Sequence, residues 1–179
     1  MKPCFASIPL VTLTLGLLSG LPGWAADQQP LPAQPGGTIP GKVAIQLVKV
    51  ADGLVDPVHV ASPNDGTGRL FVCERPGVVR IVKDGKVSAK PFLDIKDKTL
   101  SSFLEEGLYA IEFHPKFKEN GLFYVSYADL WFNGATLLTE YRVSKDNPDK
   151  ADPDSARVVM QIDFPYCNHH GGKMAFGPD

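Results

Sequence analysis

A repeat in the sequence constrains the fold of this chain more than any other feature. The segment VHVASP at 58–63 is matched by AIEFHP at 110–115, 52 positions later, and by KMAFGP at 173–178. The apolar segment that begins at Leu70 returns, again after 52 positions, at Leu122. Repeats of about 50 residues, each made of several short β-type segments, are typical of the blades of a β-propeller.

Each repeat is expected to supply four strands. The third strands are predicted at 78–83 and 137–143, and the outer strands at 91–95 and 157–162. These segments are rich in β-branched and aromatic residues, and turn formers such as Asp-Gly lie between them. The chain is therefore predicted to be all-β, with two propeller blades and the first strand of a third. A β-sandwich of the same strands is the alternative, and the matched spacing favours the propeller.

The N-terminus has the organisation of an export signal. Lys2 precedes an apolar stretch at 5–21, and the small residues Ala25 and Ala26 offer a cleavage site. Serine, threonine, glycine and proline interrupt the stretch, so a membrane anchor is the less favoured alternative. We predict a signal peptide at 1–26 and a periplasmic or secreted protein with no membrane span after cleavage.

The rest of the chain divides into a linker and one domain. Residues 27–43 are rich in Pro, Gly and Gln and are predicted to be a disordered linker. Residues 44–179 are predicted to be the N-terminal part of a propeller, because the sequence stops at a Gly-Pro-Asp turn signal. A propeller needs about four to eight blades, so the outer faces of these two blades are expected to need further blades.

Composition and charge narrow the class of protein. The 17 Gly and 16 Pro among 179 residues interrupt long helices, so a helical bundle is not expected. With 18 basic and 20 acidic residues, the chain has no basic excess for binding nucleic acid. The charged run at 145–154 predicts a solvent-facing loop. For the two cysteines beyond the signal, Cys73 and Cys167, buried thiols are favoured and a disulfide is the alternative.

The densest group of polar side chains is the sequence NHHGG at 168–172, just before the third repeat. In a propeller the loops that lead into the innermost strands form the rim of one mouth of the central channel. His169 and His170 are therefore expected at this rim, and imidazole suits proton transfer near neutral pH. Loop histidines with local hydrogen bonds are the alternative. A zinc site with Cys167 is less favoured, since adjacent side chains diverge.

Two glutamates take the corresponding place before the second repeat. Glu105 and Glu106 lead into the segment 110–115 and are expected on the same rim, with a solvated acidic pair as the alternative. His59 and His114 lie within or at the end of predicted strands and are expected to be structural.

Several motifs, taken in order, resemble the glucose/sorbosone dehydrogenase family. They are EEGL at 105–108, EFHPKF at 112–117, GLFYVSY at 121–127, NHHGG at 168–172 and FGPD at 176–179. The resemblance implies a six-bladed propeller that uses pyrroloquinoline quinone to oxidise a sugar. It places any calcium ligands beyond residue 179, and no metal site is predicted within the chain.

The resemblance also implies roles for three residues. His169 matches the general base, which would take the proton of the sugar's anomeric hydroxyl while a hydride passes to the quinone. Glu105 and His170 are the cofactor-binding candidates. Glu105 departs from the family, which has a glutamine there, and its charge would repel the quinone's carboxylates unless a cation compensates.

Two functions follow from these features. The first is an exported, quinone-dependent oxidoreductase that acts on an aldose-type sugar and passes electrons to an acceptor that the sequence does not identify. The alternative is a non-catalytic propeller that binds a glycan or a protein at the same channel mouth.

Overall fold

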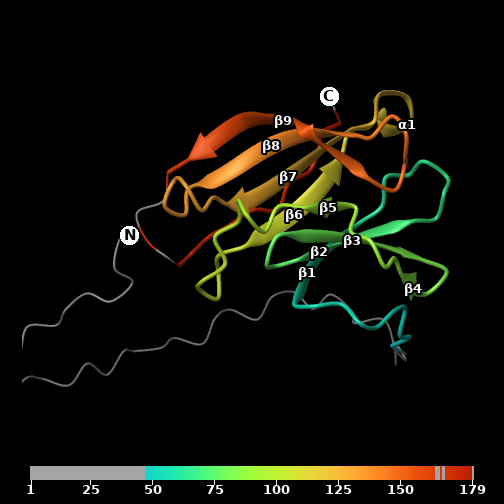
Figure 1. Cartoon of the computed structure of the whole chain (residues 1–179), viewed down its shortest axis with the longest axis horizontal. Coiled ribbons are helices and arrows are strands. Elements are labelled where there is room, and N and C mark those ends of the chain that lie inside the picture. Colours follow the sequence, from blue (N-terminus) through green and yellow to red (C-terminus); the bar gives the residue numbers. More distant parts are fainter. Residues whose placement is uncertain (1–46, 164–165, 167, 179) are drawn as a thin grey trace, which may run out of the picture. The chain divides into compact units, whose positions relative to one another are not determined.

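A computed structural model describes residues 47–163, 166 and 168–178 (Figure 1). The predicted signal peptide, 1–26, and the predicted linker, 27–43, lie outside these residues. The chain divides into two units, and the one at 5–48 falls almost wholly outside the described residues. The other unit, which includes everything from Lys49 onward, carries two antiparallel β-sheets.

The first sheet corresponds to the first repeat. Its strands are β1 (Pro57–Ala61), β2 (Leu70–Glu74), β3 (Val78–Lys83), β4 (Lys86–Val87) and β5 (Leu93–Asp94). β1, β2 and β3 form an antiparallel meander, and the short strands β4 and β5 both pair with β3. Asp84 and Gly85, between β3 and β4, have φ angles of +50° and +75°, which suits a two-residue type I′ hairpin turn.

The second sheet corresponds to the second repeat. Its strands, in both chain order and spatial order, are β6 (Leu108–Phe113), β7 (Leu122–Ala128), β8 (Thr136–Val143) and β9 (Ala151–Ile162). The connection between β6 and β7 contains the short helix α1 (Phe117–Asn120). This helix ends at Gly121 with a φ of 64°, a left-handed conformation that glycine adopts at little steric cost.

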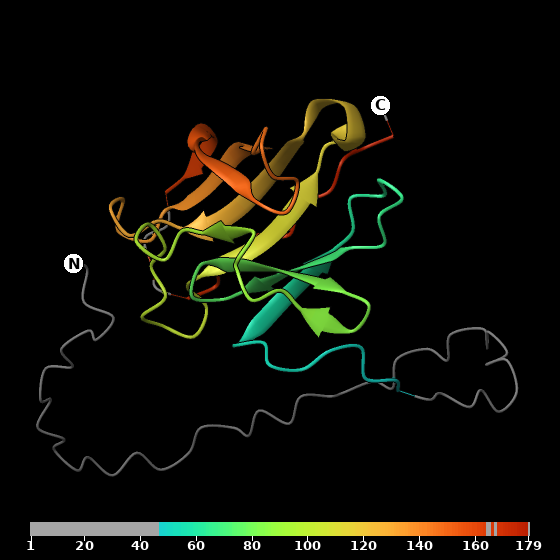
Figure 2. The same cartoon turned by 45° about the vertical axis from the view of Figure 1, so that its right-hand side comes forward.

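An apolar core lies between the two sheets, which stand side by side in Figures 1 and 2. Phe71 and Phe123 occupy the same position in the two repeats, and both are fully buried. The ring of Phe92 lies between them, with centroid distances of 4.8 and 5.0 Å. Buried residues alternate with partly exposed ones along most of β8, as expected for a strand with one face packed on a core.

The first strands of the two sheets are neighbours. His59 on β1 and Ile111 on β6 occupy equivalent repeat positions, and His59 Nε2 lies 3.2 Å from the Ile111 carbonyl oxygen. Farther out, the Ala151 N–H donates to the Phe92 carbonyl oxygen at 2.8 Å. Successive antiparallel sheets whose first strands lie side by side are the arrangement of adjacent propeller blades. His59 thus has a structural contact, in agreement with its predicted role.

The structure differs from the predicted elements at three places. In the first repeat, the outer strand predicted at 91–95 is limited to β5 (Leu93–Asp94), and β4 (Lys86–Val87), which was not predicted, also pairs with β3. The segment 173–178 has no regular secondary structure, because a strand requires a hydrogen-bonded neighbour and no described strand pairs with it. The charged run at 145–154 is a loop only as far as Lys150. β9 begins at Ala151, since this residue is buried and its N–H is bonded to the first sheet.

Two further observations concern cysteine chemistry and membranes. Cys73 on β2 is a buried free thiol, whereas Cys167 lies outside the described residues. Burial raises the pKa of the Cys73 thiol to about 12, which keeps it protonated and unreactive. None of the helices within the described part of the chain has the length and apolar content needed to cross a bilayer.

Candidate active site

Three connections leave the second sheet at the same end. Because its strands alternate in direction, the segment before β6, the β7–β8 turn and the segment after β9 all lie at this end. The first connection carries Glu105 and Glu106, and the third carries His169 and His170. The structure therefore brings the two predicted rim motifs to one end of the second sheet.

His169 is exposed, and its main chain is held by Glu105. The His169 N–H donates to the Glu105 carboxylate, across 64 positions of sequence. His169 has a φ of +67°, in the left-handed region that non-glycine residues adopt rarely. The contact fixes the main chain and leaves the imidazole ring accessible to solvent.

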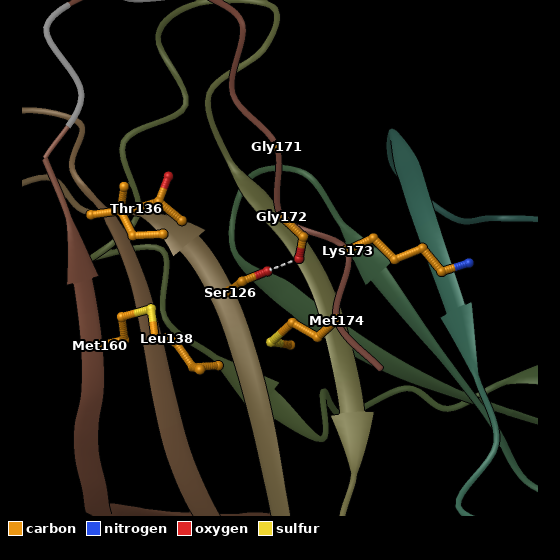
Figure 3. A pocket seen from close by; sticks show the side chains of 9 residues that line it. Ser126, Thr136, Leu138, Met160, Gly171, Gly172, Lys173 and Met174 are labelled. Carbon is orange, nitrogen blue, oxygen red and sulfur yellow. Dashed lines mark hydrogen bonds between the residues drawn. The ribbon is translucent and has the colours of Figure 1, made fainter. Parts of the chain in front are cut away.

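The residues after His169 are packed on β6 and β7. The His170 ring is stacked on Tyr109 of β6, with centroids 6.0 Å apart and an interplanar angle of 23°. The Ser126 hydroxyl on β7 donates to the carbonyl oxygen of Gly172, as drawn in Figure 3. A Cβ atom at Gly172 would lie 2.5 Å from the Tyr109 Cβ, so only glycine fits this approach.

The C-terminal segment then follows the length of β6. Gly172 contacts Tyr109 near the start of that strand, and the Phe176 ring lies 5.6 Å from the ring of His114 just after its end. His114 Nδ1 also accepts the N–H of Lys116 at 2.9 Å, which agrees with its predicted structural role. The segment thus occupies the place beside β6 where the first strand of a third blade was predicted.

The two adjacent glutamates differ in environment. Glu106 is buried and accepts the N–H of Phe103 at 3.0 Å, so it holds its own loop together. Glu105 is exposed and reaches His169. Burial, with a contribution from the Glu106 charge, raises the pKa of Tyr109 above its usual range, so the phenol beside His170 stays neutral.

Arg75 organises the loop that carries these glutamates, and sequence reasoning missed it. Its Nη1 donates to the carbonyl oxygens of Ser101, Phe103 and Glu106 at 3.0–3.1 Å. Its Nε also donates to the Asp56 carboxylate at 2.5 Å. The available signal was the Arg-Pro-Gly turn directly after β2, which places an arginine at the end of the first sheet.

An apolar groove of about 370 Å³ lies next to this segment, on the second sheet (Figure 3). Its lining residues are Ser126, Thr136, Leu138, Met160, Ile162, Gly171, Gly172, Lys173 and Met174. The Met174 side chain points into the groove, whereas the Lys173 side chain points away from it toward the first sheet. Among the described residues that line the groove, Lys173 is the titratable one, and its side chain points away.

The part of the chain that the structure describes contains no group of three or more His, Cys, Asp or Glu side chains arranged to hold a metal ion. The less favoured zinc site needs Cys167, which lies outside the described residues.

Comparison with known proteins identifies a matching family model and several related proteins. Residues 54–179 match the model of the glucose/sorbosone dehydrogenase family. Hedgehog-interacting protein of Homo sapiens is 37% identical over 144 residues, which cover 74% of this chain and 21% of that protein. An uncharacterised protein of Synechocystis is 28% identical over 144 residues and is covered to 33% of its length.

Solved structures give the same fold. An oxidoreductase of Thermus thermophilus, described as a glucose dehydrogenase, is 25% identical with a TM-score of 0.60, covering 73% of this chain and 37% of that one. The aldose sugar dehydrogenase of Streptomyces coelicolor, in its form bound to pyrroloquinoline quinone, is 22% identical with a TM-score of 0.61 over 74% of this chain and 38% of that one.

These matches confirm the predicted fold, because the neighbours are β-propellers and the two sheets correspond to blades. The chain spans about a fifth of the length of the human relative and less than two fifths of the dehydrogenase chains. The family model covers most of the chain, including the rim motifs at 105–108 and 168–172. The chain therefore belongs to the glucose/sorbosone dehydrogenase family.

Proposed function

We propose that this chain is part of an exported oxidoreductase that oxidises an aldose-type sugar at its anomeric hydroxyl, with His169 as the general base. The observation that carries the proposal is the state of the rim segment at 168–172. Its main chain is bonded to Glu105 and Ser126 and its His170 ring is stacked on Tyr109, while the His169 ring stays exposed. A catalytic base needs this combination of a fixed position and access to substrate.

In the proposed reaction, the His169 imidazole accepts the proton of the anomeric hydroxyl as hydride leaves the anomeric carbon. Pyrroloquinoline quinone, when bound, supplies the hydride acceptor. The His170 ring is stacked on Tyr109, and this contact limits the movement of the adjacent residue His169. The neutral form of an imidazole has an unprotonated ring nitrogen, which can accept a proton.

Both glutamates of the rim accept main-chain N–H groups, Glu105 from His169 and Glu106 from Phe103. These bonds orient the carboxylates but leave their negative charge in place, so an anionic quinone at this end of the sheet would need a compensating cation. The predicted contacts of Glu105 and His170 with the cofactor stay predictions, and so do calcium ligands beyond residue 179.

A binding function is the second candidate, and one observation favours it. The human relative at 37% identity is named for its interaction with Hedgehog. In that case the same rim would bind a protein or a glycan and would catalyse no reaction. An exposed imidazole on a fixed loop is also suited to hydrogen bonding with a partner.

The test uses the complete protein that contains this chain, reconstituted with pyrroloquinoline quinone and calcium and assayed for dye reduction with a panel of aldoses. We expect activity in the wild type and a fall in kcat of about 10²- to 10⁴-fold in His169→Gln, the usual range for losing a general base. His114→Gln, at the other end of β6, serves as the matched histidine control and should retain activity.

Two results would count against the enzyme. Absence of activity with every aldose, in protein that binds the quinone, would favour the binding function. Full activity in His169→Gln would remove His169 from the role of base.

A further inference from the structure

We infer that Glu105 is a positioning residue for His169, and that Arg75 of the first sheet holds Glu105 in place. The inference rests on the proposed function, since it concerns the base proposed there. It assigns to Glu105 a role within the protein rather than a contact with the cofactor.

The first step of the argument is the hydrogen bond between the two rim loops. The Glu105 carboxylate accepts the main-chain N–H of His169 itself, whereas the other described anchors act on His170 and Gly172. A bond to an ionised acceptor is about twice as strong as a neutral one. Glu105 is therefore the described side chain that sets the main-chain position from which the imidazole projects.

The second step is the backbone conformation of His169. Its φ of +67° lies in the left-handed region, which is disfavoured for a residue with a Cβ atom. Such a conformation persists when surrounding contacts fix it. Without the hydrogen bond that His169 N–H donates to Glu105, the main chain at His169 can relax toward negative φ. The imidazole would then leave its position.

The third step is the anchoring of Glu105. Its loop is tied to Arg75 by three bonds from one guanidinium nitrogen to the carbonyls of Ser101, Phe103 and Glu106. Gly107 packs directly on this arginine, since a Cβ at Gly107 would collide with the Arg75 Cγ. The loop of Glu105 is thus bonded to Arg75, which follows β2, and the Glu105 carboxylate is bonded to His169, which follows β9.

The experiment compares Glu105→Ala, Glu105→Gln and the control Glu119→Ala in the complete protein. Glu119 is exposed on α1, outside this rim. The first readout is amide hydrogen exchange of the segment 168–172, which needs neither cofactor nor activity. We expect exchange at the His169 amide to be about tenfold faster or more in Glu105→Ala, and intermediate in Glu105→Gln, whose neutral amide oxygen still accepts the N–H but more weakly.

The second readout is steady-state kinetics, if the protein oxidises aldoses. In Glu105→Ala, kcat should fall about tenfold or more with KM changed little, because the base is misplaced while sugar contacts remain. Glu105→Gln should restore most of kcat.

Wild-type exchange in Glu105→Ala would overturn the inference whatever the activity. A Glu105→Gln variant as impaired as Glu105→Ala in both readouts would also overturn it, since charge rather than positioning would then explain the effect. If no variant and no wild-type protein shows activity, the proposed function fails while the exchange measurement still decides the role of Glu105.

Discussion

At the scale of single residues, two adjacent glycines in the rim segment have opposite surroundings. Gly172 lies against the Tyr109 side chain, with no room for a Cβ atom, whereas a Cβ at Gly171 would meet nothing within 4 Å. Gly172 is thus the point at which the rim segment makes its closest approach to β6. The pair offers a test of whether this packing holds the segment in place.

Gly172→Ala should therefore displace the segment, and Gly171→Ala should not. Forcing one methyl group into a packed site costs about 1–3 kcal/mol, while an exposed substitution stays within about 0.5 kcal/mol. Thermal unfolding and amide exchange at 168–172 would measure both effects. Equal behaviour of the two variants would show that the Tyr109 contact does not fix the segment.

At the scale of elements, the loop before β6 depends on a residue from the preceding sheet. Arg75 follows β2, yet it bonds three carbonyl groups of the loop between β5 and β6. The planar guanidinium can serve several acceptors at once, and the ammonium of lysine, as a compact point charge, cannot reproduce that geometry. The conformation of this loop, which leads into the second sheet, therefore depends on Arg75, which follows a strand of the first sheet.

Arg75→Lys should loosen the segment 101–106. We expect faster limited proteolysis in that segment, with Arg142→Lys, an exposed arginine on β8, as the matched control. If Arg75→Lys is cleaved at the wild-type rate, the three carbonyl bonds do not determine the order of the loop.

At the scale of the whole molecule, Arg69 ties the two sheets together at their outer loops. It is buried, pairs with Asp65 at 2.8 Å and reaches Asp149 and the Pro148 carbonyl at 2.6 and 2.8 Å. Burial by itself would raise the pKa of Asp65, but hydrogen bonds from Thr67 and Arg69 outweigh it and lower that pKa below the ordinary value. The pair therefore contributes to stability only while Asp65 is ionised.

The sign of the pH effect follows from this lowered pKa. The stabilisation is fully present above the unfolded-state pKa of about 4 and is lost as pH falls through the lower folded-state pKa. Asp65→Asn should be less stable than wild type at pH 7, and the difference should shrink below pH 4. Denaturant unfolding across this range, with exposed Asp154→Asn as control, would measure it; a pH-independent difference would contradict the assignment.

Much of the fold could be predicted because strands leave local signals. The 52-residue spacing identified equivalent residues such as Phe71 and Phe123, which the structure buries together in one core. It also aligned His59 with Ile111, which meet across the two sheets. The segment 173–178 is predicted as a strand from its own residues but has no regular secondary structure, because strand pairing also depends on a neighbour.

The sequence by itself determined most of the strand segments, the order of the blades and the rim motifs, since apolar alternation and turn residues act over a few positions. Only the tertiary structure decided that the Glu105 carboxylate accepts the His169 N–H while Glu106 bonds within its own loop. It also decided that Arg75 bonds the loop that carries both glutamates. The contacts of Glu105 with His169 and of Arg75 with the loop before β6 join residues 26 to 64 positions apart, and they form only when packed sheets bring their loops to the same end. No local pattern encodes that distance.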